Sequence, residues 1–150
     1  MAPTQSQQRA VEIANGNLFD VFGNYDAISR REAIKSLYHE DCIAYEPYGV
    51  IFKGHDAIDK HVQEILDNNV DCEFKMVGPV KQMQNLVFIA WTFGPRGKKV
   101  AMEGTNHIVI EDGKVKVLSG VMKGTDHILV EDGKIKVLYG LVGDQADIKM

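Results

Sequence analysis

Two consecutive stretches of twenty residues near the C-terminal end repeat each other, and this repeat constrains the fold more than any other feature. Residues 102–121 read MEGTNHIVIEDGKVKVLSGV, residues 122–141 read MKGTDHILVEDGKIKVLYGL, and thirteen of the twenty aligned positions are identical. Each stretch alternates apolar and polar side chains on both sides of an Asp-Gly pair, the dipeptide favoured in two-residue hairpin turns. We therefore predict one β-hairpin from each stretch, called here the first copy (102–121) and the second copy (122–141).

Two repeat units are too few for a solenoid, which needs about three stacked units to bury a continuous core. The chain of 150 residues has the size of a single domain. We therefore expect one domain over residues 1–150 that contains both copies. Because the repeat length is even, each strand keeps its inward and outward alternation from one copy to the next.

The first half of the chain has helical patterns. Apolar residues recur every three or four positions over residues 5–22, which predicts a first helix. Ser29 and Glu32 have the spacing of a capping box, so a second helix is expected to start at Ser29 and run to about residue 38. A third apolar stripe over residues 56–67 predicts a third helix.

The second half has the two-residue period of β-strands. Strands are expected over 72–83, 86–93 and both copies, with two short strands at 42–45 and 50–52. The strand at 86–93 is apolar on both faces, as in a central strand that is covered on both sides. The sequence thus predicts the α+β class, with three N-terminal helices followed by a sheet.

The two copies differ in the polar residues of their inward face. Even-numbered residues of the first copy are expected to face inward, so that Met102 and Asn106 share one row. With a two-residue turn, Asn106 would lie opposite Ser119, and Asp126 opposite Tyr139. Only the second copy would then offer an ionisable pair.

Charge, cysteines and hydropathy exclude several classes of function. The net charge of −4 argues against nucleic acid as a partner. Cys42 and Cys72 have neither CxxC spacing nor nearby clustered histidines, so we expect no metal site and no disulfide framework. Without an apolar leader or a membrane-length apolar run, we expect a cytoplasmic protein that does not bind membranes. A small molecule or a protein is the expected partner.

The order of helices and strands resembles the ketosteroid-isomerase and SnoaL-like superfamily, whose fold is that of nuclear transport factor 2. The motifs that carry the resemblance are DCIAYEP at residues 41–47 and the Thr-Asp-His triplet that begins at Thr125. The resemblance spans nearly the whole chain. It implies a cone-shaped roll, in which a curved antiparallel sheet packs on three N-terminal helices, with one extra hairpin here. Homodimers are also implied.

The same resemblance implies the site residues. Glu46 matches the carboxylate that removes and returns a proton next to a carbonyl group, and Asp126 matches the protonated aspartate that donates a hydrogen bond to the oxyanion. Asn106 is able to donate the same bond as a neutral amide. The family's tyrosine of the first helix has no counterpart near Leu18. The expected ligand-binding residues are Tyr45, Tyr48, Met102, Asn106, Ser119 and Tyr139.

Three hypotheses for the function follow. The first is a cofactor-free isomerase, dehydratase or cyclase that acts on a small hydrophobic carbonyl compound, with no metal. The second is a non-catalytic module that binds a small molecule or another protein, as a homodimer with or without domain swapping. In the third, the chain is an engineered or duplicated variant whose two hairpins compete for one place in the sheet. His107 and His127 are expected to point outward, and His61 to lie at the surface or an interface.

Overall fold

The computed structural model describes residues 2–46, 49–98, 102–121, 126–131 and 134–140, the last two ranges as backbone alone. Its helical elements are α1 (Gln5–Asn15), the π-helix η1 (Gly16–Phe22), α2 (Ala27–Leu37) and α3 (Gly54–Asp67). Its strands are β1 (Tyr38–Glu46), β2 (Val50–Lys53), β3 (Cys72–Met83), β4 (Leu86–Pro95), β5 (Met102–Glu111), β6 (Lys114–Val121), β7 (Asp126–Glu131) and β8 (Lys134–Gly140).

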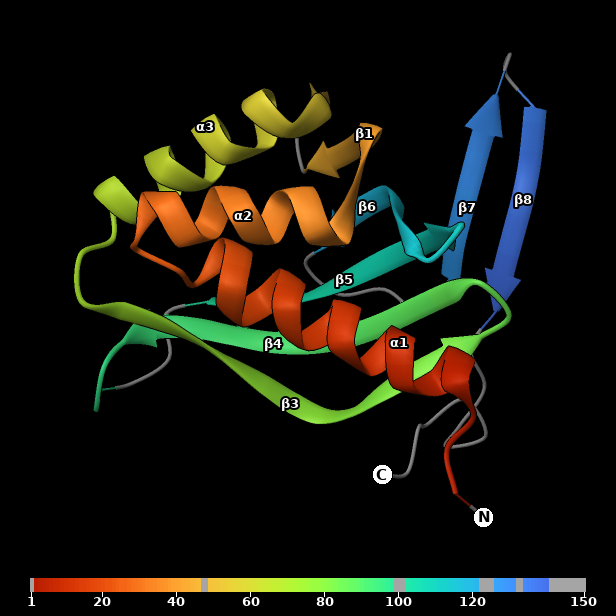
Figure 1. Ribbon diagram of the computed structural model, residues 1–150, viewed down its shortest axis with the longest axis horizontal. Coiled ribbons are helices and arrows are strands. Elements are labelled where there is room, and N and C mark those ends of the chain that lie inside the picture. Colours follow the sequence, from red (N-terminus) through yellow and green to blue (C-terminus); the bar gives the residue numbers. More distant parts are fainter. Residues whose placement is uncertain (1, 47–48, 99–101, 122–125, 132–133, 141–150) are drawn as a thin grey trace.

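Six strands form one curved sheet in the order β2-β1-β6-β5-β4-β3, and the helices cover one of its faces (Figure 1). The predicted α+β class and the helical layer over a curved sheet are confirmed. The sheet is mixed, because β1 pairs with β6 in parallel while the other neighbouring strands in it are antiparallel. The parallel pair brings the end of β1 next to the end of β6, with Tyr45 aligned with Ser119.

The predicted helical spans are confirmed, with one correction at the start of the second helix. The first span runs as α1 and continues without a break into η1. The second helix begins at Ala27, because the carboxylate of Asp26 accepts a hydrogen bond from the backbone N–H of Ser29. The predicted capping box at Ser29 is therefore wrong, because Asp26, an equally good N-cap residue three positions earlier, caps the helix instead.

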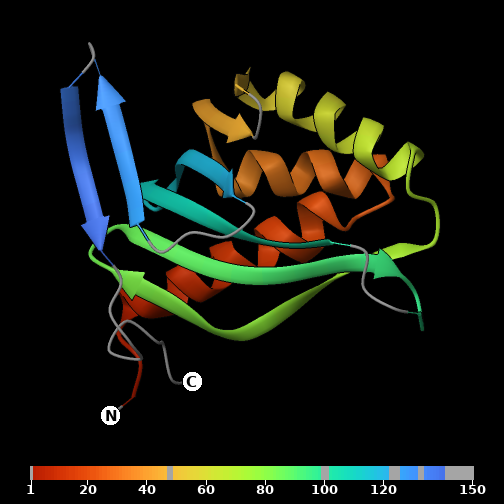
Figure 2. The same cartoon turned by 180° about the vertical axis from the view of Figure 1, so that it is seen from behind.

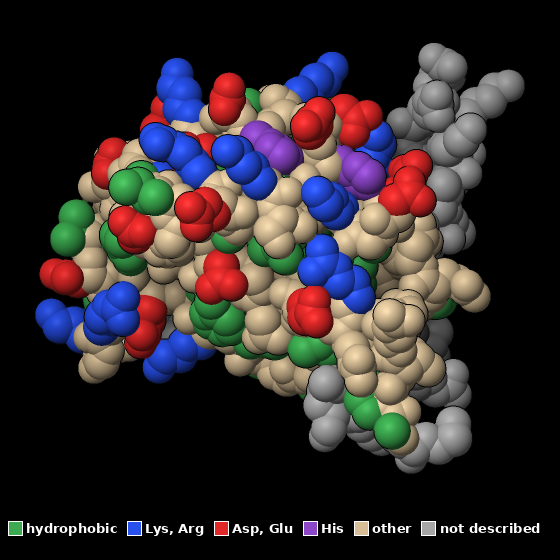
Figure 3. All heavy atoms as spheres, viewed as in Figure 1, with side chains coloured by type: hydrophobic (Ala, Val, Ile, Leu, Met, Phe, Trp, Pro, Cys, Tyr) green, Lys and Arg blue, Asp and Glu red, His purple; other side chains and the backbone are tan. Residues whose placement is uncertain are grey.

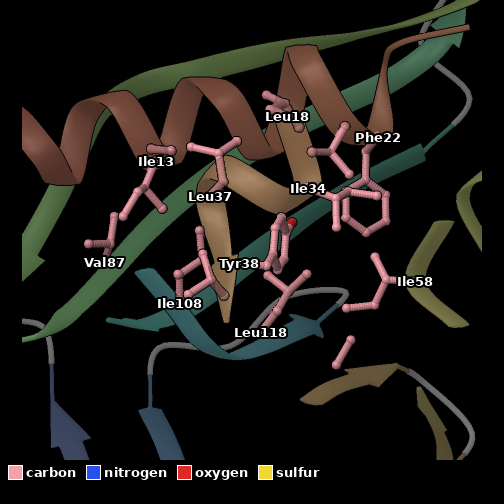
Figure 4. Close-up of a cluster of buried hydrophobic side chains, with 14 of the residues drawn as sticks. Ile13, Leu18, Phe22, Ile34, Leu37, Tyr38, Ile58, Val87, Ile108 and Leu118 are labelled. Atoms are coloured by element: carbon pink, nitrogen blue, oxygen red, sulfur yellow. The ribbon is translucent and has the colours of Figure 1, made fainter. Parts of the chain in front are cut away.

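The hydrophobic core lies between the helices and the sheet, with Tyr38 at its centre (Figure 4). The hydroxyl group of Tyr38 donates a hydrogen bond to the Oδ1 atom of Asn17, which the wide turn of η1 carries into the core. Burial raises the pKa of Tyr38 well above its ordinary value, with smaller contributions from Cys42 and Glu46. The hydroxyl group therefore stays protonated and acts as a neutral donor inside the core.

The hairpins of the two copies occupy different places. The first copy forms β5 and β6 between β4 and β1, and its Asp112-Gly113 turn has the predicted positive φ angles of 51° and 76°. The strands of the second copy, β7 and β8, form a separate two-stranded sheet at one end of the molecule (Figure 2). The place between β1 and β4 is thus held by the first copy.

The pairing within the first copy is shifted from the prediction. Asn106 lies opposite Gly120, because a bulge between Val109 and Ile110 shifts the register by one residue. The predicted pairing of Asn106 with Ser119 is therefore wrong. The second copy has a bulge at the equivalent position, and Asp126 lies opposite Gly140 for the same reason, so the predicted pairing with Tyr139 is also wrong.

One buried cation joins α2 to α3. The side chain of Arg30 is fully buried, and its Nε atom donates to the Oδ1 atom of Asp59 at 2.7 Å. The second oxygen of Asp59 accepts from Arg31 at 3.0 Å, and the remaining Arg30 nitrogens donate to Gln63 and to the backbone of Asn24. Each nitrogen of the buried guanidinium group thus has a partner, as a buried charge requires.

Because of this ion pair, we expect the protein to become less stable at acidic pH. Burial acts to raise the pKa of Asp59, but hydrogen bonds and the charges of Arg30 and Arg31 outweigh it and hold the pKa below its ordinary value. A carboxylate with a lowered folded-state pKa stabilises the protein above its unfolded pKa of about 4, and this contribution is lost as the pH falls. Urea unfolding between pH 7 and 3 measures this contribution. We expect the free energy of unfolding to fall less with decreasing pH for Asp59→Asn than for the wild type. Asp56→Asn removes an exposed carboxylate from the same helix, so its free energy of unfolding should fall with decreasing pH as steeply as that of the wild type. Equal slopes of free energy against pH for all three proteins would contradict the role of Asp59.

Charges of both signs are interspersed over the helical face (Figure 3). The whole chain has 17 Lys and Arg residues against 21 Asp and Glu residues. A protein that binds a phosphate backbone instead gathers positive charge on one face. Among the helices that the structure describes, none has the length and hydropathy needed to span a bilayer.

Candidate functional site

A cavity of about 340 Å³ opens between the helical layer and the sheet. Its volume is in the range of small-molecule sites, which are mostly apolar with a few polar groups that orient the ligand. The polar side chains of the cavity come from Glu46, His61, Asn69 and Asn106. The rest of its lining consists of Leu18, Phe22, Ile65, Phe74, Trp91, Phe93, Met102, Gly120 and Val121.

Glu46 supplies the carboxylate of the cavity. It is the last residue of β1, and the parallel pairing with β6 carries it over Gly120. A Cβ atom on Gly120 would lie 3.0 Å from the Oε2 atom of Glu46, so this carboxylate oxygen packs directly on the β6 backbone. The side chain is 19% exposed. Glu46 is thus a carboxylate in a mainly apolar cavity, the setting in which enzymes use carboxylates as bases.

His61 lies beside this carboxylate. Its Nε2 atom is 3.7 Å from the Oε1 atom of Glu46, and its side chain is also 19% exposed. The imidazole ring stacks on Phe52 with 4.1 Å between ring centroids and meets the ring of Phe22 edge-on. We expected His61 at the surface or at an interface, so these contacts were not predicted. The signal was available, because His61 is four residues from both Ala57 and Ile65 and thus shares the apolar stripe of its helix.

Asn106 supplies the amide of the cavity. The indole N–H of Trp91 donates to the Oδ1 atom of Asn106 at 3.1 Å. An indole N–H can only donate, so it fixes which end of the amide faces Trp91. The Nδ2 amino group is then the end of the Asn106 amide that does not face Trp91.

Two glycines of the first copy make room for these side chains. A Cβ atom on Gly104 would lie 2.4 Å from the ring of Trp91, which is closer than packed atoms approach. Gly120 makes the same kind of room for Glu46. Glycine inside a strand often marks such a close approach, so both positions were recognisable as special from the sequence. Both glycines recur in the second copy, as Gly124 and Gly140.

The Gly104 contact gives a prediction about stability. Gly104→Ala should destabilise the protein by about 1–3 kcal/mol, because the Trp91 ring has to move and its hydrogen bond to Asn106 is strained. Thermal unfolding followed by circular dichroism measures the loss. In a Trp91→Phe background, Gly104→Ala should lower the free energy of unfolding clearly less, because the clashing ring atoms are gone. Equal costs in both backgrounds would show that Gly104 is required for another reason.

The structure brings together some of the predicted site residues. Glu46, Asn106 and Met102 line the same cavity. Tyr45 and Ser119 are not among its lining residues: Tyr45 is 40% exposed, and Ser119 is buried opposite His107. Three further predicted residues fall outside what the structure describes. They are Tyr48, whose placement is not described, and Asp126 and Tyr139, whose side chains are not described.

His107 differs from the sequence prediction in its burial. The alternation of β5 directs it away from Asn106, as expected, yet its side chain is only 1% exposed. The ring of Phe88 from β4 packs edge-on against it with 5.1 Å between centroids. The second face of the sheet is therefore also packed at this position, in agreement with the apolar character of β4 on both faces.

Comparison with known proteins identifies the family. A sequence model described as a SnoaL-like domain matches residues 17–118, which end inside β6 of the first copy. The search of curated proteins found no match for this chain.

Solved structures agree in fold. A protein assigned as an isomerase of the SnoaL-like family from Agrobacterium tumefaciens has a TM-score of 0.71 at 16% identity, over 78% of this chain and 99% of the other. A SnoaL-like protein from Jannaschia, assigned as a polyketide cyclase, has a TM-score of 0.66 at 10% identity, over 80% and 89% of the two chains. An epoxide hydrolase from Mycobacterium tuberculosis has a TM-score of 0.56 at 10% identity, over 75% and 81%. The helical layer, the curved sheet and the sequence match over residues 17–118 together show that the chain belongs to the SnoaL-like domain family.

Proposed function

We propose that the protein is a cofactor-free enzyme that moves a proton within a small hydrophobic carbonyl compound. The observation that carries the proposal is the meeting of the Glu46 carboxylate and the Asn106 amide in one apolar cavity. Glu46 would act as the base and Asn106 as the hydrogen-bond donor to the carbonyl oxygen. Membership of a family that includes proteins assigned as isomerases and cyclases supports this class of reaction.

The proposed step begins at the carbon next to the carbonyl group. The carboxylate of Glu46 accepts a proton from this carbon, the C–H electron pair forms a carbon–carbon double bond, and the carbonyl electrons move to oxygen. The Nδ2 group of Asn106 stabilises the negative oxygen by a hydrogen bond that strengthens as charge develops. Where the compound also has a carbon–carbon double bond conjugated with the enolate, return of the proton from Glu46 to the far end of that bond completes an isomerisation, and return to the same carbon reverses the step.

Deuterium exchange tests the proposal without knowledge of the natural substrate. In D₂O the step replaces the hydrogens next to a carbonyl group with deuterium, which proton NMR follows in 2-indanone, 2-tetralone and 2-decalone. We expect the protein to accelerate this exchange for at least one of these ketones above the buffer rate. Binding without exchange for all three would instead favour a non-catalytic binding module. The single tryptophan of the chain, Trp91, lines the cavity and reports binding by its fluorescence.

A second proposal concerns the two copies: we propose that the second copy arose by duplication and competes with the first for its place in the sheet. The equivalent bulges of the two hairpins support this, as do the retained glycines. In the competing arrangement Asp126 would stand at the position of Asn106, next to Glu46. The cavity would then contain a carboxyl group in place of an amide.

Two deletions test this competition. Removal of residues 122–141 keeps the copy that the sheet contains, whereas removal of residues 102–121 forces the second copy into its place. We expect both shortened proteins to unfold cooperatively, with melting temperatures within about 4 °C of each other, a difference of roughly 1 kcal/mol for a domain of this size. Circular dichroism and calorimetry measure this. If only the protein that lacks 122–141 folds, the second copy is unable to replace the first.

We also propose a homodimer that forms through the uncovered face of the sheet, with or without exchange of the second copy. Support comes from Val77 of β3, which is 51% exposed, and from its partner Ala90 on β4. Contiguous apolar patches on an exposed sheet face are typical of association surfaces, and in this proposal Val77 and Ala90 belong to such a patch. Sedimentation velocity should give twice the monomer mass of 16.7 kDa for the wild type and a smaller mass for Val77→Glu. A wild-type monomer at all concentrations would contradict the dimer.

A further inference from the structure

We propose that His61 is a second catalytic residue, which gives its Nε2 proton to the oxygen of the ligand while Glu46 removes a proton from carbon. Within the described part of the chain, the Nε2 atom of His61 is buried without a hydrogen-bond partner. Its separation of 3.7 Å from the Oε1 atom of Glu46 is too long for a hydrogen bond. Among the described residues, neither group therefore has a hydrogen-bond partner that a ligand in the cavity would have to displace.

The position of His61 fits a proton donor. A buried polar group without a partner is unfavourable, and a hydrogen bond to a ligand oxygen would remove this cost on binding. The ring is held on two sides, stacked on Phe52 and edge-on to Phe22, so little motion has to be lost when the ligand binds. A carbonyl oxygen and its neighbouring C–H group belong to adjacent carbons, and His61 and Glu46 are spaced to reach one each.

The proton balance follows from these positions. The step requires His61 as the imidazolium ion and Glu46 as the carboxylate. As Glu46 takes the proton from carbon, the carbonyl oxygen takes the Nε2 proton from His61, which leaves a neutral enol, a neutral imidazole and a protonated Glu46. Both protons return when Glu46 protonates carbon and the enol oxygen gives its proton back to Nε2. Asn106 would donate a second hydrogen bond to the same oxygen, so the oxygen need not carry a full negative charge.

Chemical rescue tests this role, which rests on the proposed proton transfer. His61→Ala should lower the deuterium exchange of 2-tetralone by about 100-fold, the usual contribution of an acid or base. The binding of 2-naphthol, a planar analogue of its enol, should weaken by about tenfold by Trp91 fluorescence, because the naphthol oxygen loses its hydrogen bond to the imidazole ring. Free imidazole should then restore the rate at least about tenfold, because it fills the space left by the ring and supplies the proton.

The control variants separate packing from catalysis. His61→Gln keeps a polar side chain of similar length without an acidic group, and it should stay slow with or without imidazole. His55→Gln changes the other histidine of α3, whose Nε2 atom bonds to the backbone of Tyr38, and should keep the wild-type rate. Phe52→Leu should be slow as well, because it removes the stacking contact that orients His61.

Each outcome has a separate meaning. A wild-type rate in His61→Ala, or a slow rate that imidazole does not restore, would overturn the catalytic role of His61. The role of Glu46 would stand if Glu46→Gln alone abolished exchange. A wild-type protein that exchanges none of the three ketones would remove the proposed function, and the role of His61 with it.

Discussion

Replacement of Glu46 by Gln is expected to lower the rate of deuterium exchange by at least about 100-fold, the loss typical of a missing general base. An amide of the same shape is unable to accept the proton from carbon. Because Glu46 packs on Gly120 mainly through its shape, the melting temperature should stay within about 3 °C, a change below 1 kcal/mol for a domain of this size. Binding of 2-naphthol, followed by Trp91 fluorescence, should stay within about threefold, since the lost interaction acts in the transition state.

A matched control exists on the same strand. Glu40 is an exposed carboxylate of β1, so Glu40→Gln changes the net charge equally without touching the cavity. It should exchange the ketones at the wild-type rate. If Glu46→Gln and Glu40→Gln were both as fast as the wild type, Glu46 would have no part in the chemistry.

Loss of the Asn106 side chain is expected to have the second largest effect. Asn106→Ala removes the donor to the carbonyl oxygen, and the loss of one such donor usually lowers the rate by about 100-fold or more. It also leaves the indole N–H of Trp91 without its acceptor, which should lower the free energy of unfolding by about 1–3 kcal/mol. Exchange kinetics and urea unfolding measure the two effects separately.

Asn106→Asp separates stability from catalysis. The carboxyl group still accepts the bond from Trp91, so stability should be closer to that of the wild type than for Asn106→Ala. The ionised form of this carboxyl group has no proton to donate, so exchange should slow as the pH rises above the pKa of the new group. The variant also carries, at position 106, the residue type that the second copy has at Asp126. Wild-type exchange in both variants would remove Asn106 from the mechanism.

Much of the fold was predictable from local patterns. The three helical spans follow from apolar spacing, and the alternation in β5 correctly separates Asn106 from His107. The errors came from competition between local signals. Asp26 caps the second helix in preference to Ser29, and the bulge beside Val109 shifts the pairing in a way that hydrophobic alternation does not reveal.

The site was only partly predictable, because it depends on contacts between distant segments. The family resemblance pointed to Glu46, and strand alternation pointed to Asn106 and Met102 on the inward face. His61 was missed because its helical position alone does not reveal a carboxylate on a neighbouring strand. The hydrogen bond from Trp91 to Asn106 depends on the pairing of β4 with β5, which no local pattern predicts.

A crystal structure of the protein with 2-naphthol would show whether Glu46 and Asn106 act together on one ligand. We expect the naphthol ring inside the cavity, packed against Phe74 and Trp91. The naphthol oxygen should lie within hydrogen-bond distance of the Nδ2 atom of Asn106, and the Glu46 carboxylate should lie against the carbon next to it. A naphthol bound elsewhere, or bound in the cavity with its oxygen turned away from both Asn106 and Glu46, would rule out the proposed proton transfer.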